Sequence, residues 1–104
     1  MLISRESELG VDQTVLYNVP AGKETSVTTI HVANTSGVAR TFTIYLRPLG
    51  GSARPISTLN RALDVDEIAI SDDAIKMAAG CYIEGIASGS GITCVITGIE
   101  TNLT

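Results

Sequence analysis

The segment "HVANTSGVARTFTIYL" (residues 31–46) decides the fold class, because alternating apolar and polar residues flank a turn. In its second half, Phe42, Ile44 and Leu46 alternate with threonine and tyrosine, so in an extended strand the three apolar side chains share one face. A two-residue period of this kind is typical of a strand that is buried on one side. The segment therefore predicts β structure, with no residue pattern that carries catalytic chemistry.

The two halves of the segment are expected to pair as a hairpin over residues 30–46. Pairing Val32 with Phe42 places both side chains on one face of the sheet. The five residues 35–39 include a glycine and have a length that hairpin connections use. The same register places His31 on the opposite, outer face, across from Thr43.

A second hairpin is predicted at residues 81–100, where "SGSG" joins two alternating strands. In the expected register Cys81 and Cys94 share the core face but lie on the order of 13 Å apart. A disulfide needs Cα atoms within about 7 Å. We therefore expect both cysteines to be reduced and to act as small buried apolar residues.

Further strands are expected at residues 14–19, 25–34, 56–65 and 67–70. In the second of these the apolar set changes parity after Val27, which indicates a β-bulge or partial burial of both faces. The segment "SDDAIKMAAG" (71–80) allows a short helix capped by Ser71 or a turn followed by a short strand. The strand is the favoured alternative, because the neighbouring segments are strands.

The composition extends the β pattern to the whole chain. The 104 residues include twelve Ile, eight Val and twelve Thr, which suit pleated strands, and ten Gly, which suit turns. Short strands with regular turn signals predict a single-domain antiparallel β-sandwich of the jelly-roll kind. Residues 1–13 show no clear pattern and are expected to form an N-terminal arm ordered by a partner, so the sandwich itself would span residues 14–104.

Charge is distributed unevenly along the chain, whose net charge is −4. Residues 25–63 carry four arginines and no acidic residue, whereas residues 64–104 carry seven acidic residues and one lysine. Ordinary solvated charge explains this pattern, but so does a two-signed surface that packs copies or partners side by side. The candidate subunit or particle contacts are Ile3, Leu9 and Val11 on the arm, and Arg40, Arg47, Arg54, Arg61, Asp64 and Asp66.

Motifs for catalysis, metal binding and cofactor binding are not found in the sequence. His31 is the only histidine and lacks zinc-ligand spacing with the cysteines. The carboxylates of residues 64–73 do not follow the spacing of an EF-hand, and an Asp64–Asp66 glycosidase pair lacks an aromatic sugar platform. Four spread arginines are too few for a nucleic-acid surface. The chain has no apolar run of membrane-spanning or signal-peptide length, so we expect a protein made in the cytosol, without membrane insertion.

The stretch "LYNVPAGKETSVTTIHVANTSGVARTFTIYLRPLGGSA" resembles a group of small virion proteins of tailed bacteriophages. The group shows a strand ending in "VPAGK", an "N-T-S-G" turn, a Gly-Gly-Ser loop, an Ala-Gly turn and a final "V-x-x-x-G-x-E" strand. Ala79, Gly80 and "VITGIE" (95–100) match the last two of these. Cys81 departs from the pattern, since an acidic residue would be expected after the Ala-Gly turn.

The resemblance implies a β-sandwich building block of a phage particle without catalytic residues, cofactor or metal. Its partners would be other copies of itself and the capsid, neck or tail proteins of the virion, assembled in the host cytoplasm. A capsid decoration or cement subunit in a symmetric oligomer is the leading expectation. A neck, collar or tail-associated subunit, or a small host-surface or glycan-binding module, are the alternatives.

Overall fold

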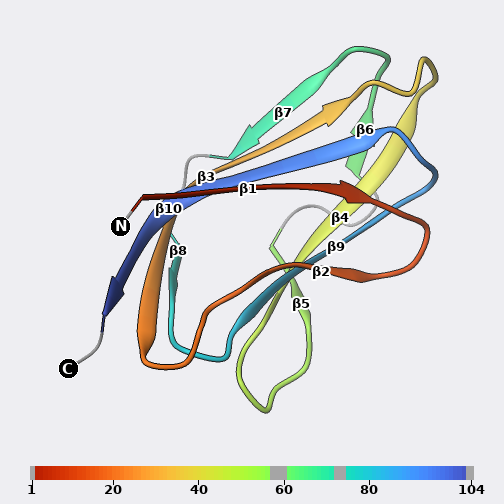
Figure 1. The fold of residues 1–104 in the computed structure, drawn as a ribbon. Helices are drawn as coiled ribbons and strands as arrows, with labels where there is room; N and C mark the ends of the chain where they lie inside the picture. The colour runs from red at the N-terminus through yellow and green to blue at the C-terminus, as the bar shows by residue number, and fades with distance from the viewer. Residues whose placement is uncertain (1, 57–60, 72–74, 103–104) are drawn as a thin grey trace.

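The computed structural model describes residues 2–56, 61–71 and 75–102, which form two packed antiparallel sheets (Figure 1). The strands are β1 Leu2–Leu9, β2 Thr14–Asn18, β3 Lys23–Asn34, β4 Arg40–Arg47, β5 Arg54–Pro55, β6 Arg61–Leu63, β7 Ile68–Ser71, β8 Ile75–Met77, β9 Tyr82–Ala87 and β10 Ile92–Asn102. Sheet A has the order β1-β10-β3, with β7 and β8 both beside β3. Sheet B has the order β2-β9-β4, with β5 and β6 beside β4. The predicted all-β, antiparallel sandwich is confirmed.

The strand order is that of a jelly roll. The first strand pairs with the last, the second with the ninth, the third with β7 and β8, and the fourth with β5 and β6. This is the result of winding one long antiparallel hairpin into two layers, which gives a sandwich with Greek-key connections. Most strands that pair are therefore far apart in the sequence, with β4 and β5 as an exception, and strands that are consecutive in the sequence often face each other across the core.

Both predicted hairpins are wrong for this reason. Strands β3 and β4 lie in different sheets, and so do β9 and β10, so the loops at 35–39 and 88–91 cross between the layers. Alternation specifies which face of a strand is buried, but it does not specify which strand lies beside it. Val32 and Phe42 are both buried as expected, but they approach the same core from opposite sheets.

The two crossing loops pack against each other at one end of the sandwich. The backbone N–H of Thr35 donates to the carbonyl of Gly91 at 2.8 Å. The buried Asn34 side chain accepts from the Ser36 N–H at 3.0 Å and donates to the carbonyl of Leu63 at 3.0 Å. A β-carbon on Gly91, whose φ is +88°, would lie 2.4 Å from the Ser36 β-carbon. The fold thus explains the "NTSG" motif, because its residues hold together the two loops that connect the sheets.

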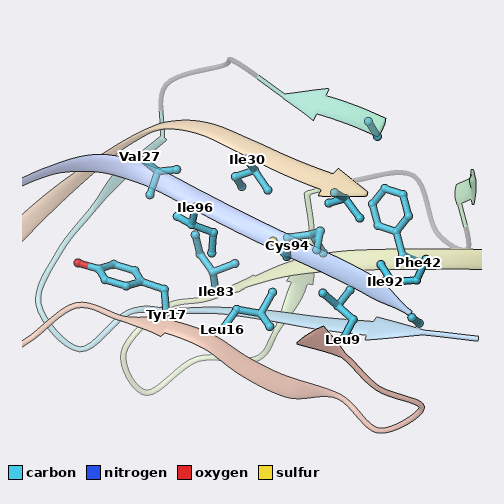
Figure 2. Packing of buried hydrophobic residues seen from close by; sticks show 14 of the residues in the cluster. Leu9, Leu16, Tyr17, Val27, Ile30, Phe42, Ile83, Ile92, Cys94 and Ile96 are labelled. Atoms are coloured by element: carbon cyan, nitrogen blue, oxygen red, sulfur yellow. The ribbon is translucent and has the colours of Figure 1, made fainter. Parts of the chain in front are cut away.

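The core lies between the two sheets (Figure 2). It is apolar and includes Ile3, Leu9, Leu16, Tyr17, Val27, Ile30, Phe42, Ile83, Ile92, Cys94 and Ile96. Both cysteines are free thiols, as expected. Burial raises the pKa of Cys94 to about 12, so this thiol is inert. Cys81 is only half-buried, which differs from the prediction.

The predicted N-terminal arm is wrong, because residues 2–9 form an integral strand of sheet A. All eight residues of β1 pair antiparallel with β10, from Leu2 opposite Ile99 to Leu9 opposite Ile92. Ile3 and Leu9 are buried in the chain's own core. The strand was missed because Arg5 interrupts the inward alternation. Its guanidinium lies 6.0 Å from the centre of the Tyr17 ring.

The remaining strand predictions are mostly confirmed. The β-bulge in β3 lies at Thr28, where the pairing with β10 shifts between Thr97 and Gly98. Residues 75–77 form a strand, in agreement with the favoured alternative, whereas 72–74 lie outside the described residues. Of the strand expected over 56–65, the structure places 61–63 in β6, and 57–60 lie outside its description.

Candidate functional site

The outer face of sheet A is a broad surface with few charges. Strand pairing aligns its outward-pointing side chains in rows that cross β1, β10, β3 and β7. One row is Glu6, Val95, His31 and Ile70, and the next is Glu8, Thr93, Ala33 and Ile68. Toward the other end lie Ser4, Thr97 and Thr29, then Leu2, Ile99, Ser26 and, on β8, Lys76. We call this set of side chains the A face.

Several apolar side chains on the A face are strongly exposed. Leu2 is 82% exposed, Ile68 and Ile70 are 58% exposed each, and Ile99 is 45% exposed. The strands at the centre, β10 and β3, contribute only threonine, serine, valine, alanine, isoleucine and His31 between residues 26–33 and 93–99 of this face. Contiguous apolar surface that is rimmed by polar residues marks an interaction site more often than isolated exposed residues do.

The A face also contains a shallow groove. Its volume is about 340 Å³, and it is lined by Leu2, Ile3, Ser4, Thr28, Thr97 and Gly98. The groove lies where β1, β10 and β3 meet at the bulge, because the extra residue Thr28 interrupts the regular pleat of β3. Hydroxyl groups of Thr28 and Thr97 are engaged with backbone carbonyls of the sheet, at 3.2 and 3.4 Å. The groove therefore offers mainly shape and methyl groups to a partner.

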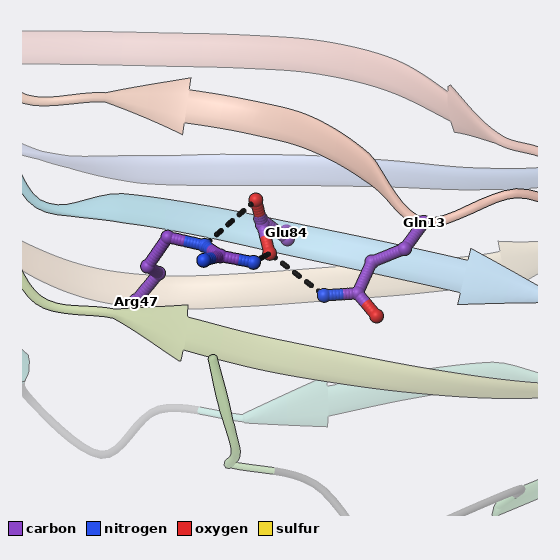
Figure 3. Close-up of polar contacts among 3 residues, drawn as sticks. All are labelled: Gln13, Arg47 and Glu84. Atoms are coloured by element: carbon purple, nitrogen blue, oxygen red, sulfur yellow. Dashed lines mark hydrogen bonds and ion pairs between the residues drawn. The ribbon is translucent and has the colours of Figure 1, made fainter. Parts of the chain in front are cut away.

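The outer face of sheet B is built differently, around a fixed ion pair (Figure 3). Glu84 on β9 accepts a hydrogen bond from Gln13 Nε2 at 2.7 Å, and Arg47 on β4 contacts both of its carboxylate oxygens at 3.3 Å. The Glu84 side chain is only 10% exposed. This cluster ties the β1–β2 loop to sheet B, and its polar groups satisfy one another.

The ion pair changes the expected role of Arg47. Sequence reasoning offered Arg47 as a contact for a neighbouring molecule, but the structure uses its guanidinium within the chain. Arg47→Glu should lower the free energy of unfolding by about 2–3 kcal/mol, because it places a second carboxylate beside the nearly buried Glu84. Urea denaturation measures this loss. Arg54→Glu is the matched control, since Arg54 is exposed and should change stability by less than about 0.5 kcal/mol.

A buried polar network joins the two sheets at the opposite end of the core from the crossing loops. The Tyr17 hydroxyl on β2 donates to Glu100 on β10 at 2.8 Å and lies 2.7 Å from the hydroxyl of Thr25 on β3. Lys23 lies 3.5 Å from the same carboxylate. The hydrogen bond from Tyr17 holds the pKa of Glu100 below its usual value, and burial raises the pKa of Tyr17. The network is a structural clamp, because its groups are engaged with one another.

The other predicted contact residues have mixed outcomes. Ile3 and Leu9 cannot contact a partner, because they are buried in the core of their own chain. Val11 is 64% exposed and remains available. Asp64 and Asp66 are exposed, but they lie in a turn after β6 in which Asp66 adopts a φ of +61°. They do not share the face of an extended strand, which was the arrangement expected of a glycosidase-like pair.

The predicted basic surface is not assembled by the fold. Arg40 and Arg47 lie at opposite ends of β4, which separates them by about 23 Å. Arg40 Nε donates to the carbonyl of Ser90 at 3.3 Å, and the Arg61 guanidinium lies 5.9 Å from the centre of the Phe42 ring. Among the four arginines, only the side chain of Arg54 has no ion pair, hydrogen bond or ring contact with the described residues. The arginines therefore form separate contacts and not one docking patch.

Sites for small ligands are not evident in the described part of the chain. A cavity of about 40 Å³ between the sheets, lined by apolar side chains with Arg61 and Ser71, holds little more than one water. No group of three or more histidine, cysteine or acidic side chains is placed to hold a metal ion among these residues. His31 points outward as expected, although its strand partners are Val95 and Ile70 and not Thr43. The described residues also include no helix with the length and apolarity of a membrane span.

The residues that sequence reasoning missed are Ile68 and Ile70, which alternate with buried Ala69 in "EIAIS". The alternation of apolar residues in this segment could have been noticed, but the alternation alone does not tell which set of side chains faces the core.

Comparison of the chain with protein-family models, with curated proteins and with solved structures finds no match.

Proposed function

We propose that this chain is a structural subunit of a bacteriophage virion, and in particular a capsid decoration subunit that binds the particle through the A face. The observation that carries the proposal is the apolar and threonine-rich centre of the A face, whose charged side chains Glu6, Glu8 and Lys76 lie at its margins, with Ile68 and Ile70 exposed at one edge. The resemblance of residues 14–100 to small phage virion proteins supports the same role. A fold alone does not specify function, and jelly rolls occur both in viral capsids and in lectins.

The rigid construction of the domain suits a structural role. Two sheets with a continuous core and polar clamps between elements keep the A face in one shape. A preformed surface loses little conformational entropy when it docks, so many copies can bind with modest contacts each. Neck, collar or tail positions in the same particle would use the same surface, and they differ from capsid decoration in the number of copies.

Incorporation into particles tests the proposal through matched variants. Val95→Lys places a charge at the centre of the A face, while Ile86→Lys places the same charge on the outer face of sheet B. Both positions are half-buried within a central strand, so the folding cost should be similar. We expect Val95→Lys to reduce incorporation at least tenfold and Ile86→Lys to leave it unchanged, measured by mass spectrometry of purified particles. Equal incorporation of both variants would contradict the proposal.

The copy number in those particles distinguishes the position. Hundreds of copies would indicate capsid decoration, and six to twelve would indicate a neck, collar or tail position. Absence of the protein from washed particles would reject the virion role altogether.

A glycan-binding module is the second candidate, because the outer face of sheet B gathers two of the three tyrosines. Tyr45 lies opposite Glu84 and Tyr82 opposite Arg47, so both tyrosines point outward beside the fixed ion pair. Aromatic rings next to oriented polar groups are common in sugar sites. Binding to host-surface polysaccharide that is lost in Tyr82→Ala, with incorporation unaffected, would favour this role for sheet B.

A further inference from the structure

Strand β7 is an edge strand without the protection that other edges carry. Its sequence Ile68–Ser71, "IAIS", has no charge, no proline and no bulge. The other described edge strands differ: β1 carries Arg5, Glu6 and Glu8, β5 is Arg54–Pro55, β6 begins with Arg61, β8 contains Lys76, and β2 has a register shift. Charges, prolines and bulges at edges prevent pairing with other chains, so their absence at β7 is informative.

The backbone of β7 leaves hydrogen-bonding groups on its open side. The Asn34 N–H donates to the carbonyl of Glu67 at 3.0 Å, so the carbonyl of residue 67 points toward β3. Because these groups alternate sides along an antiparallel strand, residues 69 and 71 also face β3, whereas Ile68 and Ile70 face the open edge. In the part of the chain that the structure describes, β3 is the only strand that pairs with β7. Figure 1 shows β7 as the outermost strand of sheet A.

We propose that two copies of this chain pair antiparallel through β7, about a two-fold axis that passes beside Ala69. Directly opposed residues in a sheet point to the same face, so only registers that join residues of equal parity keep the two A faces on one side. The register with Ala69 opposite Ala69 of the second copy satisfies this rule. It also places Ile68 opposite Ile70 of the second copy, and the reverse, with their free backbone groups facing each other.

The side chains of β7 in one copy are complementary to those of β7 in the second copy. On the A face, the two Ile68–Ile70 pairs form one apolar cluster from four residues that are each 58% exposed in the single chain. On the core side, the small Ala69 at the axis leaves room for its copy. Ser71 comes opposite Glu67 of the second copy, where a hydroxyl can donate to a carboxylate. A second copy is therefore a better partner for this edge than an unrelated strand, since the residues of β7 match the same residues of a second β7.

The pairing has a consequence for assembly that goes beyond the proposed virion role. Sheet A would extend across both copies, and the two A faces would become one continuous surface. Only a few residues pair at the junction, so the isolated dimer should be weak and form at high micromolar to millimolar concentrations, with neighbours in a particle adding further contacts.

Sedimentation equilibrium of the wild-type chain and two lysine variants tests the proposal. We expect the wild type to change from monomer to dimer over this concentration range. Ile70→Lys should weaken dimerisation at least tenfold, whereas Ile99→Lys, which adds the same charge to the A face on β10, should not. A wild type that stays monomeric, or a dimer that survives Ile70→Lys unchanged, would overturn the proposal.

Disulfide trapping tests the register independently of variant stability. Under mild oxidation, an equal mixture of Ile68→Cys and Ile70→Cys should form covalent dimers several times faster than either variant alone or the wild type, because residue 68 lies opposite residue 70 and neither lies opposite itself. Faster coupling of one variant with itself would reject the register. Failure of these tests leaves particle incorporation through the A face untouched, so the two proposals are separable.

Discussion

Removal of residues 1–9 is expected to abolish cooperative folding. The deletion takes away an eight-residue strand and two core side chains, Ile3 and Leu9, and it uncovers the edge of β10 along its length. Losing each buried side chain costs about 2–5 kcal/mol. A domain of this size has a total stability of about 5–15 kcal/mol. Thermal unfolding followed by circular dichroism should therefore show no transition for the truncated chain.

A matched pair of point variants supports the same conclusion without truncation. Leu9→Ala should cost about 2–5 kcal/mol because Leu9 is fully buried, whereas Leu2→Ala at the other end of β1 should cost less than about 0.5 kcal/mol because Leu2 is 82% exposed. If residues 1–13 were instead a free arm, the truncated chain would unfold at the wild-type temperature, and Leu9→Ala would behave like Leu2→Ala.

The second large effect is expected at Gly98. A β-carbon at this position would lie 2.4 Å from the carbonyl oxygen of Ser26 and 3.0 Å from the Val27 α-carbon, both backbone atoms of the neighbouring strand β3. Backbone atoms inside a paired sheet cannot move aside as a flexible side chain can. Gly98→Ala should therefore cost about 1–3 kcal/mol, or more if the bulge at Thr28 is displaced.

Gly10→Ala is the control for this prediction. No atom lies within 4 Å of a β-carbon built at Gly10. This substitution should leave stability unchanged or raise it by up to about 1 kcal/mol through the unfolded chain. Equal urea midpoints for the two variants would show that β10 and β3 are not packed as closely as described.

The sequence predicted local structure well and strand neighbours poorly, for a physical reason. The alternation at residues 40–47 identified β4 and its buried face, and the parity change after Val27 located the bulge in β3. A buried face is a property of one strand, so its pattern is visible in the sequence. The partner of a strand depends on how the chain winds, and the jelly roll joins β1 to β10 and β2 to β9 across most of the chain.

The candidate surface was hidden for a related reason. The arginines and aspartates were conspicuous in the sequence, but the fold engages Arg47 with Glu84 and places Asp64 and Asp66 in a turn. The A face, in contrast, is made from ordinary threonines, valines and isoleucines on four strands that only the topology brings together. Uncharged side chains form an interaction surface only when neighbouring strands bring them together, and the pattern of residues along the sequence does not show which strands are neighbours.

Covalent footprinting of the free protein and of the assembled particle tests the central claim most directly. The claim is that the A face is buried on assembly while the outer face of sheet B stays exposed. Labelling by a photoactivated carbene should fall at least severalfold in the peptides that carry Ile68, Ile70 and Val95, and it should be unchanged at Tyr45 and Tyr82. Unchanged labelling of the A face, with protection of the two tyrosines, would contradict the account.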